Sequence, residues 1–155
     1  MKNVKVLWTI IILLLALSGF LIKTFISGNV VASNDGRTNV VLTKDERDLV
    51  LGEMRAFLVS LQGVSQAITE NDMEKVAKLS HEAGMAAEAN TPGSLLQKLP
   101  LGMKKLGFGT RDKFDEISAT AKKTKDASIV RKQLDALMQN CIACHAIYRL
   151  PEPKV

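Results

Sequence analysis

Two cysteines and a histidine near the C-terminus are the residues whose spacing most directly predicts chemistry in this 155-residue chain. Cys141 and Cys144 are three positions apart in the segment CIACH, and His145 follows directly. This spacing is typical of covalent attachment of a c-type haem, in which both thiols bond to the porphyrin and the imidazole binds the iron. The sequence therefore predicts one covalent haem c, anchored by Cys141 and Cys144, with His145 as the proximal iron ligand.

Three other interpretations of these residues stay open from the sequence. A zinc site needs four ligands, and beyond CIACH the chain offers only His81 and carboxylates, with no second cysteine pair. A thioredoxin-like dithiol is expected beside a strand–helix–strand pattern, which the sequence does not display. The third is a structural disulfide, because the chain contains only these two cysteines.

The N-terminus predicts export. Two lysines in the first five residues precede an apolar run from Val6 to Ile22, which Lys23 closes. The run exceeds the ~7 to 15 residues usual in a cleaved signal and approaches the ~20 of a membrane span. Residues 1–32 are therefore expected to be an export signal or an N-terminal membrane anchor. The length favours an anchor, although residues 30–32 resemble a cleavage site, and in both cases the remaining chain faces the periplasm.

The net charge does not indicate a nucleic-acid partner. The formal charge of +5 includes three lysines and no acidic residue from the first 32 positions. Without them, 18 basic residues face 16 acidic ones, and the two haem propionates would bring that balance near zero. Binding to nucleic acid needs a strongly basic surface, so this class of partner is excluded.

Helical periodicity begins after a Gly- and Asn-rich stretch, and residues 33–42 are expected to form a linker. Thr43 and Glu46 make a capping box, and apolar residues then recur every three or four positions as far as Ile68. Further helices are predicted after Asp72, after Pro100, and from about residue 127 to 149. No strand pattern is visible.

The fourth predicted helix places the attachment site on a core-facing stripe. Its apolar and ligating residues repeat at helical spacing: Val130, Leu134, Leu137, Cys141, Cys144, His145 and Tyr148. Cofactors of helical bundles lie between such inward faces. The sequence thus predicts an all-α fold over residues 43–150, an antiparallel four-helix bundle with haem attached near the C-terminal end of the fourth helix.

The chain resembles the class II c-type cytochromes, the cytochrome c prime family. The resemblance rests on CIACH being close to the C-terminus, behind four predicted helices, and on the tail CHAIYR at residues 144–149. It implies an exported electron carrier with periplasmic redox partner proteins and a homodimer formed through the first two helices. It also implies that Arg149, one helical turn after His145, lies beside the haem on its proximal side. No acid–base pair or nucleophile is placed near the haem by spacing, so no enzymatic activity is expected.

The resemblance further implies that a residue of the first helix faces the iron opposite His145. Met54 is the only methionine in that helix and lies on its apolar stripe. A methionine in this position gives six-coordinate iron suited to electron transfer. The leading hypothesis is therefore a single-electron carrier with His145 and Met54 as axial ligands.

An alternative hypothesis follows from the family's arginine, which stands four residues before the distal position. Counting from Arg47 places Leu51 over the iron, and counting from Arg55 places Val59 there. An aliphatic residue leaves the iron five-coordinate, so the alternative is a cytochrome c prime that binds nitric oxide or carbon monoxide.

Overall fold

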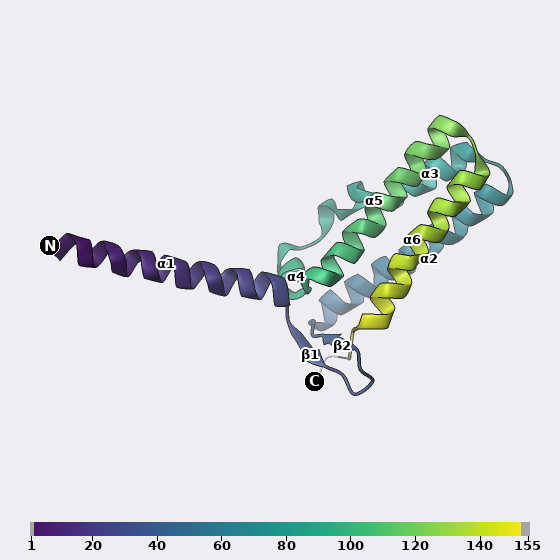
Figure 1. Cartoon of the computed structure of the whole chain (residues 1–155). Coiled ribbons are helices and arrows are strands. Elements are labelled where there is room, and N and C mark those ends of the chain that lie inside the picture. Colours follow the sequence, from purple (N-terminus) through teal and green to yellow (C-terminus); the bar gives the residue numbers. More distant parts are fainter. Residues whose placement is uncertain (1, 153–155) are drawn as a thin grey trace.

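The computed structural model describes residues 2–152, and this part of the chain is predominantly helical, as the sequence predicts. Helix α1, Lys2–Ser27, extends away from all other elements (Figure 1). Its large apolar side chains from Val4 to Ile26 are exposed. Among the described residues, Val4–Ser27 is the only helix long and apolar enough to cross a membrane, which agrees with an export signal or an anchor.

Helix α2, Lys44–Thr69, begins at the predicted capping box. The backbone N–H of Glu46 donates to the Thr43 hydroxyl at 3.4 Å, and the backbone N–H of Thr43 donates to the Glu46 carboxylate at 2.9 Å. These two bonds satisfy donors that the first turn of a helix leaves unpaired. The predicted start of the first helix is therefore confirmed.

The three other long helices also start close to their predicted positions: α3 (Met73–Ala83), α5 (Leu101–Thr124) and α6 (Ala127–Ile147). Asp72 and Asp126 cap α3 and α6 by accepting backbone N–H groups of the first turn, and Pro100 directly precedes α5. Between α3 and α5 lie two short helical segments, the 3-10 helix η1 (Met85–Asn90) and α4 (Gly93–Lys98).

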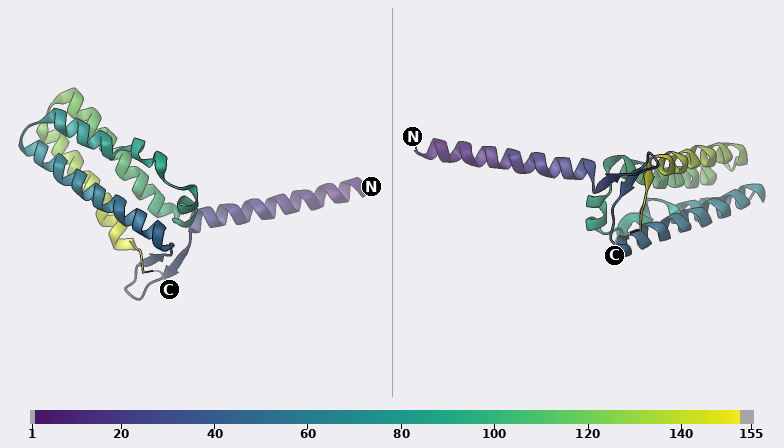
Figure 2. Two further views of the ribbon diagram at one scale, coloured as in Figure 1. Left: turned by 180° about the vertical axis from the view of Figure 1, so that it is seen from behind. Right: turned by 90° about the horizontal axis from the view of Figure 1, so that it is seen from below.

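Helices α2, α3, α5 and α6 contribute to one apolar core. In both views of Figure 2 these four helices lie alongside one another. Phe57 of α2 stacks on Phe114 of α5 with ring centroids 5.8 Å apart. The fully or almost fully buried members of this core are Val64, Ala67, Val76, Phe114, Ile117, Ala121, Val130, Leu134 and Leu137.

A small sheet is present although the sequence shows no strand pattern. Its strands are β1 (Val30–Ala32), β2 (Thr38–Val40) and β3 (Tyr148–Arg149). β2 pairs antiparallel with β1 and parallel with β3, joining the segment after α1 to the segment after α6. Strands of two or three residues are too short to show an alternating pattern.

The sheet changes two boundaries expected from the sequence. Residues 33–42, expected as a linker, contain β2 and the fully buried Val40. The fourth helix, expected to reach Arg149, ends at Ile147. Leu150 precedes Pro151, which disfavours helical backbone at Leu150, and β2 supplies the backbone partners that the helix would have provided.

A second apolar cluster lies at this end of the helices. It joins Val40 and Leu42 to Val50 of α2, Leu95 of α4 and Met103 of α5. Its half-buried neighbours are Met54, Leu99, Cys144, Tyr148 and Leu150. The predicted attachment site therefore borders both apolar clusters, because Cys141 packs against the first and Cys144 against the second.

Candidate functional site

Both cysteines lie near the end of α6, one helical turn apart on the same face. They are half-buried free thiols, so the structure contains no disulfide between them. Burial raises the pKa of Cys141 and of Cys144, which keeps both thiols protonated at neutral pH. Because the two thiols are unbridged and only half-buried, both can be reached from the neighbouring cavity.

A cavity of about 560 Å³ opens beside the two thiols. This volume is in the range of sites that hold cofactors and drug-sized molecules. Its apolar lining comes from α2, α4, α5 and α6 and includes Val50, Leu51, Met54, Phe57, Leu58, Leu61, Leu95, Leu96, Leu99, Met103, Leu106, Phe108, Cys141 and Cys144. Gly107 is also part of the lining, and a Cβ built there would meet no atom within 4 Å.

His145 borders this cavity and a smaller adjoining one of about 160 Å³. Its side chain is exposed, while its backbone carbonyl accepts a hydrogen bond from Arg37 at 3.4 Å. The histidine therefore lies at the rim of the cavity, next to the thiol of Cys144, where its ring remains accessible.

Two of the three residues considered for the distal position line the same space. Met54 and Leu51 are half-buried, and each borders both cavities, as His145 does. Val59 is 71% exposed and borders neither. Val59 is therefore excluded as the distal residue, whereas Met54 and Leu51 both remain candidates.

A second methionine, Met103 of α5, also borders both cavities and is buried. The sequence does not single it out, because Met103 precedes the regular apolar stripe of α5 and a methionine is commonly a packing residue. Its position matters for the site, since it offers a second thioether at the same cavity as Met54.

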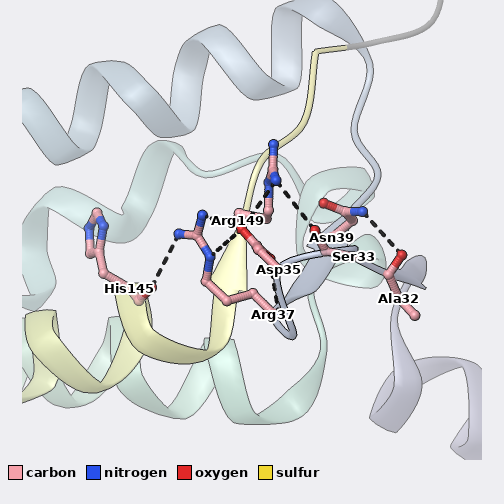
Figure 3. Close-up of polar contacts among 7 residues, drawn as sticks. All are labelled: Ala32, Ser33, Asp35, Arg37, Asn39, His145 and Arg149. Carbon is pink, nitrogen blue, oxygen red and sulfur yellow. Dashed lines mark hydrogen bonds and ion pairs between the residues drawn. The ribbon is translucent and has the colours of Figure 1, made fainter.

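Arg149 is held by the turn between β1 and β2 (Figure 3). Its guanidinium donates to Ser33 Oγ at 3.3 Å and to Asp35 Oδ2 at 3.2 Å. Arg37 pairs with the same Asp35 oxygen at 2.7 Å, and hydrogen bonds from Arg37 hold the pKa of the Asp35 carboxyl well below its usual range. Arg149 also borders the smaller cavity together with His145, but from a strand and not from the predicted helix.

An ion cluster around the buried Arg111 also borders the larger cavity. Arg111 of α5 is 5% exposed and pairs with Glu88 at 2.5 Å and with Glu53 at 3.6 Å. Its guanidinium also lies 4.8 Å from the centre of the Phe57 ring. Burial raises the pKa of Glu53, and the charge of Arg111 opposes that rise. Thr91 borders the cavity nearby, and its buried hydroxyl has no hydrogen-bond partner in the described structure.

A second buried cation, Lys104, borders the cavity on the side of α1. Its ammonium group donates to the carbonyl of Phe25 at 2.8 Å, and burial lowers its pKa. The inward position of both cations can be recognised in the sequence. Lys104 and Arg111 precede Phe114 at helical spacing and therefore lie on the same face of α5.

The zinc interpretation gains no support from the geometry. Within residues 2–152, no group of three or more His, Cys, Asp or Glu side chains is arranged to hold a metal ion. His81, the one further histidine, is 64% exposed and lies 3.6 Å from Asp115, away from the cavity lining. The cysteines and His145 therefore do not form a closed tetrahedral site with a fourth protein ligand.

No protein-family model, no curated protein and no solved structure matches this chain. The functional interpretation consequently depends on the residues of the chain and on their arrangement.

Proposed function

We propose that this chain is a membrane-anchored c-type haem protein of the class II cytochrome type, which carries single electrons on the periplasmic side of the membrane. In this proposal α2, α3, α5 and α6 form an antiparallel four-helix bundle around the haem. The observation that carries it is one cavity of about 560 Å³ bordered by Cys141, Cys144, His145 and Met54. An apolar cavity with a few convergent polar groups is the usual form of a cofactor site.

The two thiols would anchor the haem. Cys141 and Cys144 would hold the porphyrin through two thioether bonds, each made by adding S–H across a vinyl group without an oxidant. Cys141 and Cys144 both line the cavity, and they lie one helical turn apart on α6.

The axial ligands decide what the site does. Haem supplies an iron that alternates between the ferric and ferrous states. His145 of α6 and Met54 of α2 would hold the iron, and a His/Met pair of ligands raises the reduction potential of haem.

Retention of the N-terminal helix is supported by what its removal would break. Cleavage after Ala32 would take away β1 and Asn29, which bonds to Lys98 and Val41. It would also remove the carbonyl of Phe25, the acceptor of the buried Lys104 ammonium. The loss of these contacts between the end of α1 and the helices supports an anchor over a cleaved signal.

A second candidate function is supported by Leu51, which borders the same two cavities as Met54. If Leu51 covers the iron, the haem is five-coordinate and binds nitric oxide or carbon monoxide in place of carrying electrons.

The ferric absorption spectrum separates the two candidates. We expect a low-spin spectrum with a methionine-to-iron charge-transfer band that disappears in Met54→Ala and persists in the matched Met103→Ala variant. The ferrous protein should then refuse carbon monoxide. A high-spin spectrum with rapid uptake of carbon monoxide would contradict the electron carrier and support the gas-binding protein. Loss of the band only in Met103→Ala would identify Met103 of α5 as the distal ligand in place of Met54.

A further inference from the structure

The junction between α1 and the remaining helices is a packed contact. α1 ends at Ser27, and Asn29 then makes three hydrogen bonds to two other segments. Its backbone N–H donates to Lys98 at 2.7 Å, its side chain donates to the Val41 carbonyl at 3.0 Å, and its own carbonyl accepts from Val41 at 2.8 Å. Three bonds from one residue fix the direction in which α1 leaves.

Gly28 brings this junction into close contact with the backbone before α5. Its φ of +64° lies in the left-handed region, which favours glycine. A Cβ at this position would lie 2.5 Å from the carbonyl oxygen of Lys98 and from the nitrogen of Pro100. Only glycine allows the chain to approach α4 this closely, so no flexible spacer separates α1 from the helices.

Lys104 of α5 adds a third contact with the end of α1. We call the contacts made by Gly28, Asn29 and Lys104 the clamp. It is 5% exposed, and its ammonium group reaches the carbonyl of Phe25 at 2.8 Å and lies 3.7 Å from the centre of the Phe25 ring. The carbonyls of the last turn of a helix lack intrahelical partners and carry the negative end of the helix dipole. A buried cation is therefore bound where α1 can stabilise it.

The depth of this contact follows from the end of the apolar run. Lys23 closes the run, and Phe25 lies two residues further along α1, a rise of about 3 Å. The headgroup region extends roughly 5 to 7 Å beyond the hydrocarbon on each side. If α1 spans the bilayer, the contact between Phe25 and Lys104 lies within the headgroup region.

We propose that the helical domain lies on the phospholipid headgroups with the cavity end toward the bilayer, an orientation called the seating below. The clamp of Gly28, Asn29 and Lys104 holds the domain in this orientation relative to α1. α4 and the sheet lie at the end where α1 leaves, and the turns joining α2 to α3 and α5 to α6 lie at the opposite end (Figures 1 and 2). Because Lys104 also borders the candidate haem cavity, the haem would lie beside the membrane surface. The inference rests on the proposed anchor but not on haem.

A photoreactive phenylalanine analogue tests this seating. It is placed either at the exposed Gln97 of α4 or at the exposed Lys123, near the far end of α5. The two sites are separated by most of the length of α5, roughly 30 Å. The full-length protein is reconstituted in vesicles of phosphatidylcholine and phosphatidylglycerol, illuminated, and weighed by mass spectrometry. We expect an adduct of one phospholipid at position 97 and none at position 123.

Lys104→Met tests the clamp itself, with Lys113→Met on the same helix as the matched control. Loss of the ammonium should reduce the lipid adduct at position 97 and raise it at position 123, while the control keeps the original pattern. Circular dichroism verifies that both variants retain their helices. Equal yields at both positions in the unmodified protein, or no adduct at either, would overturn the seating, and an unchanged pattern in Lys104→Met would overturn the clamp.

The same mass spectrum separates this inference from the proposed function. A lipid adduct at position 97 on a chain without covalent haem would support the seating and contradict the proposed cofactor. Covalent haem with no preference for position 97 would retain the cofactor and reject the seating. A mature chain that lacks residues 1–32 would reject the anchor and the seating together.

Discussion

The guanidinium of Arg111 is the charge on which one wall of the cavity depends. Two carboxylates, those of Glu88 and Glu53, pair with it in a region where it is almost completely buried. Removing one member of a buried ion cluster leaves the others without compensation, and this is more costly than the cluster is favourable. The residue thus contributes to stability through the partners it neutralises.

Arg111→Ala is expected to lower the free energy of unfolding by about 2 kcal/mol, because the bond to Glu88 and the packing on Phe57 are lost. Urea titration followed by circular dichroism measures the loss. Lys105→Ala, at an exposed position of the same helix, is the control and should change stability by no more than about 0.5 kcal/mol. Equal losses in the two variants would show that the buried pairing does not carry this stability.

At the residue scale, the residues that share one helix face could be predicted from their spacing, whereas contacts between distant segments could not. The common face of Cys141 and Cys144 follows from their spacing on one helix, whereas His145, expected on the core-facing stripe, is exposed. The partners of Arg111 and Lys104 lie on other elements, up to 79 positions away in the case of Phe25. Such contacts depend on packing that no single stretch of sequence specifies.

At the scale of elements, Glu46 joins the start of α2 to the end of α4. Its carboxylate completes the capping box and accepts from the Lys98 ammonium group at 2.7 Å. The hydrogen bond from Lys98, with that from the Thr43 backbone, lowers the pKa of Glu46. A carboxyl whose pKa is lower in the folded state stabilises the fold at neutral pH, and this contribution is lost as the pH falls.

Glu46→Gln keeps a residue suited to the capping box but removes the ion pair. We expect the unmodified protein to be more stable than this variant by about 1 kcal/mol at pH 7, with the difference disappearing as the pH falls below the ordinary glutamate pKa of 4.5. Thermal unfolding at a series of pH values measures it, with Glu82→Gln as the control for the loss of one exposed carboxylate. A difference that persists at pH 3 would assign the effect to something other than the charge of Glu46.

The helices were predictable because each has a local start signal and a repeated apolar stripe. Thr43 with Glu46, Asp72 and Asp126 each cap a helix within three residues of sequence. The strands were not, because β3 contains only two residues and its partner β2 lies more than a hundred positions earlier. The end of α6 at Ile147 is set by that pairing and by Pro151, and not by the helical stripe.

At the scale of the whole molecule, α1 is the one described helix that is long and apolar enough to cross a membrane. Its composition was enough to predict an export signal or an anchor, since the apolar residues form one uninterrupted run. The packed junction at Gly28 and Asn29 was not predictable, because it joins the end of α1 to backbone about seventy residues later.

We expect the full-length protein to remain in the membrane pellet after extraction with alkaline carbonate. A variant with Leu13→Lys and Leu14→Lys should appear in the supernatant, since each charge at the centre of a span costs about 2.5 to 3.5 kcal/mol. Immunoblotting of both fractions measures the distribution. Release of the unmodified protein would contradict an anchor.

The mass of the intact protein tests the central claim most directly. Produced in a bacterium that attaches haem to exported proteins, the chain should weigh more than its amino acids by the mass of one haem. The addition should remain after denaturation and be absent when Cys141 and Cys144 are both replaced by alanine. A denatured chain with the mass of its amino acids alone, from cells that load another c-type protein, would contradict the account.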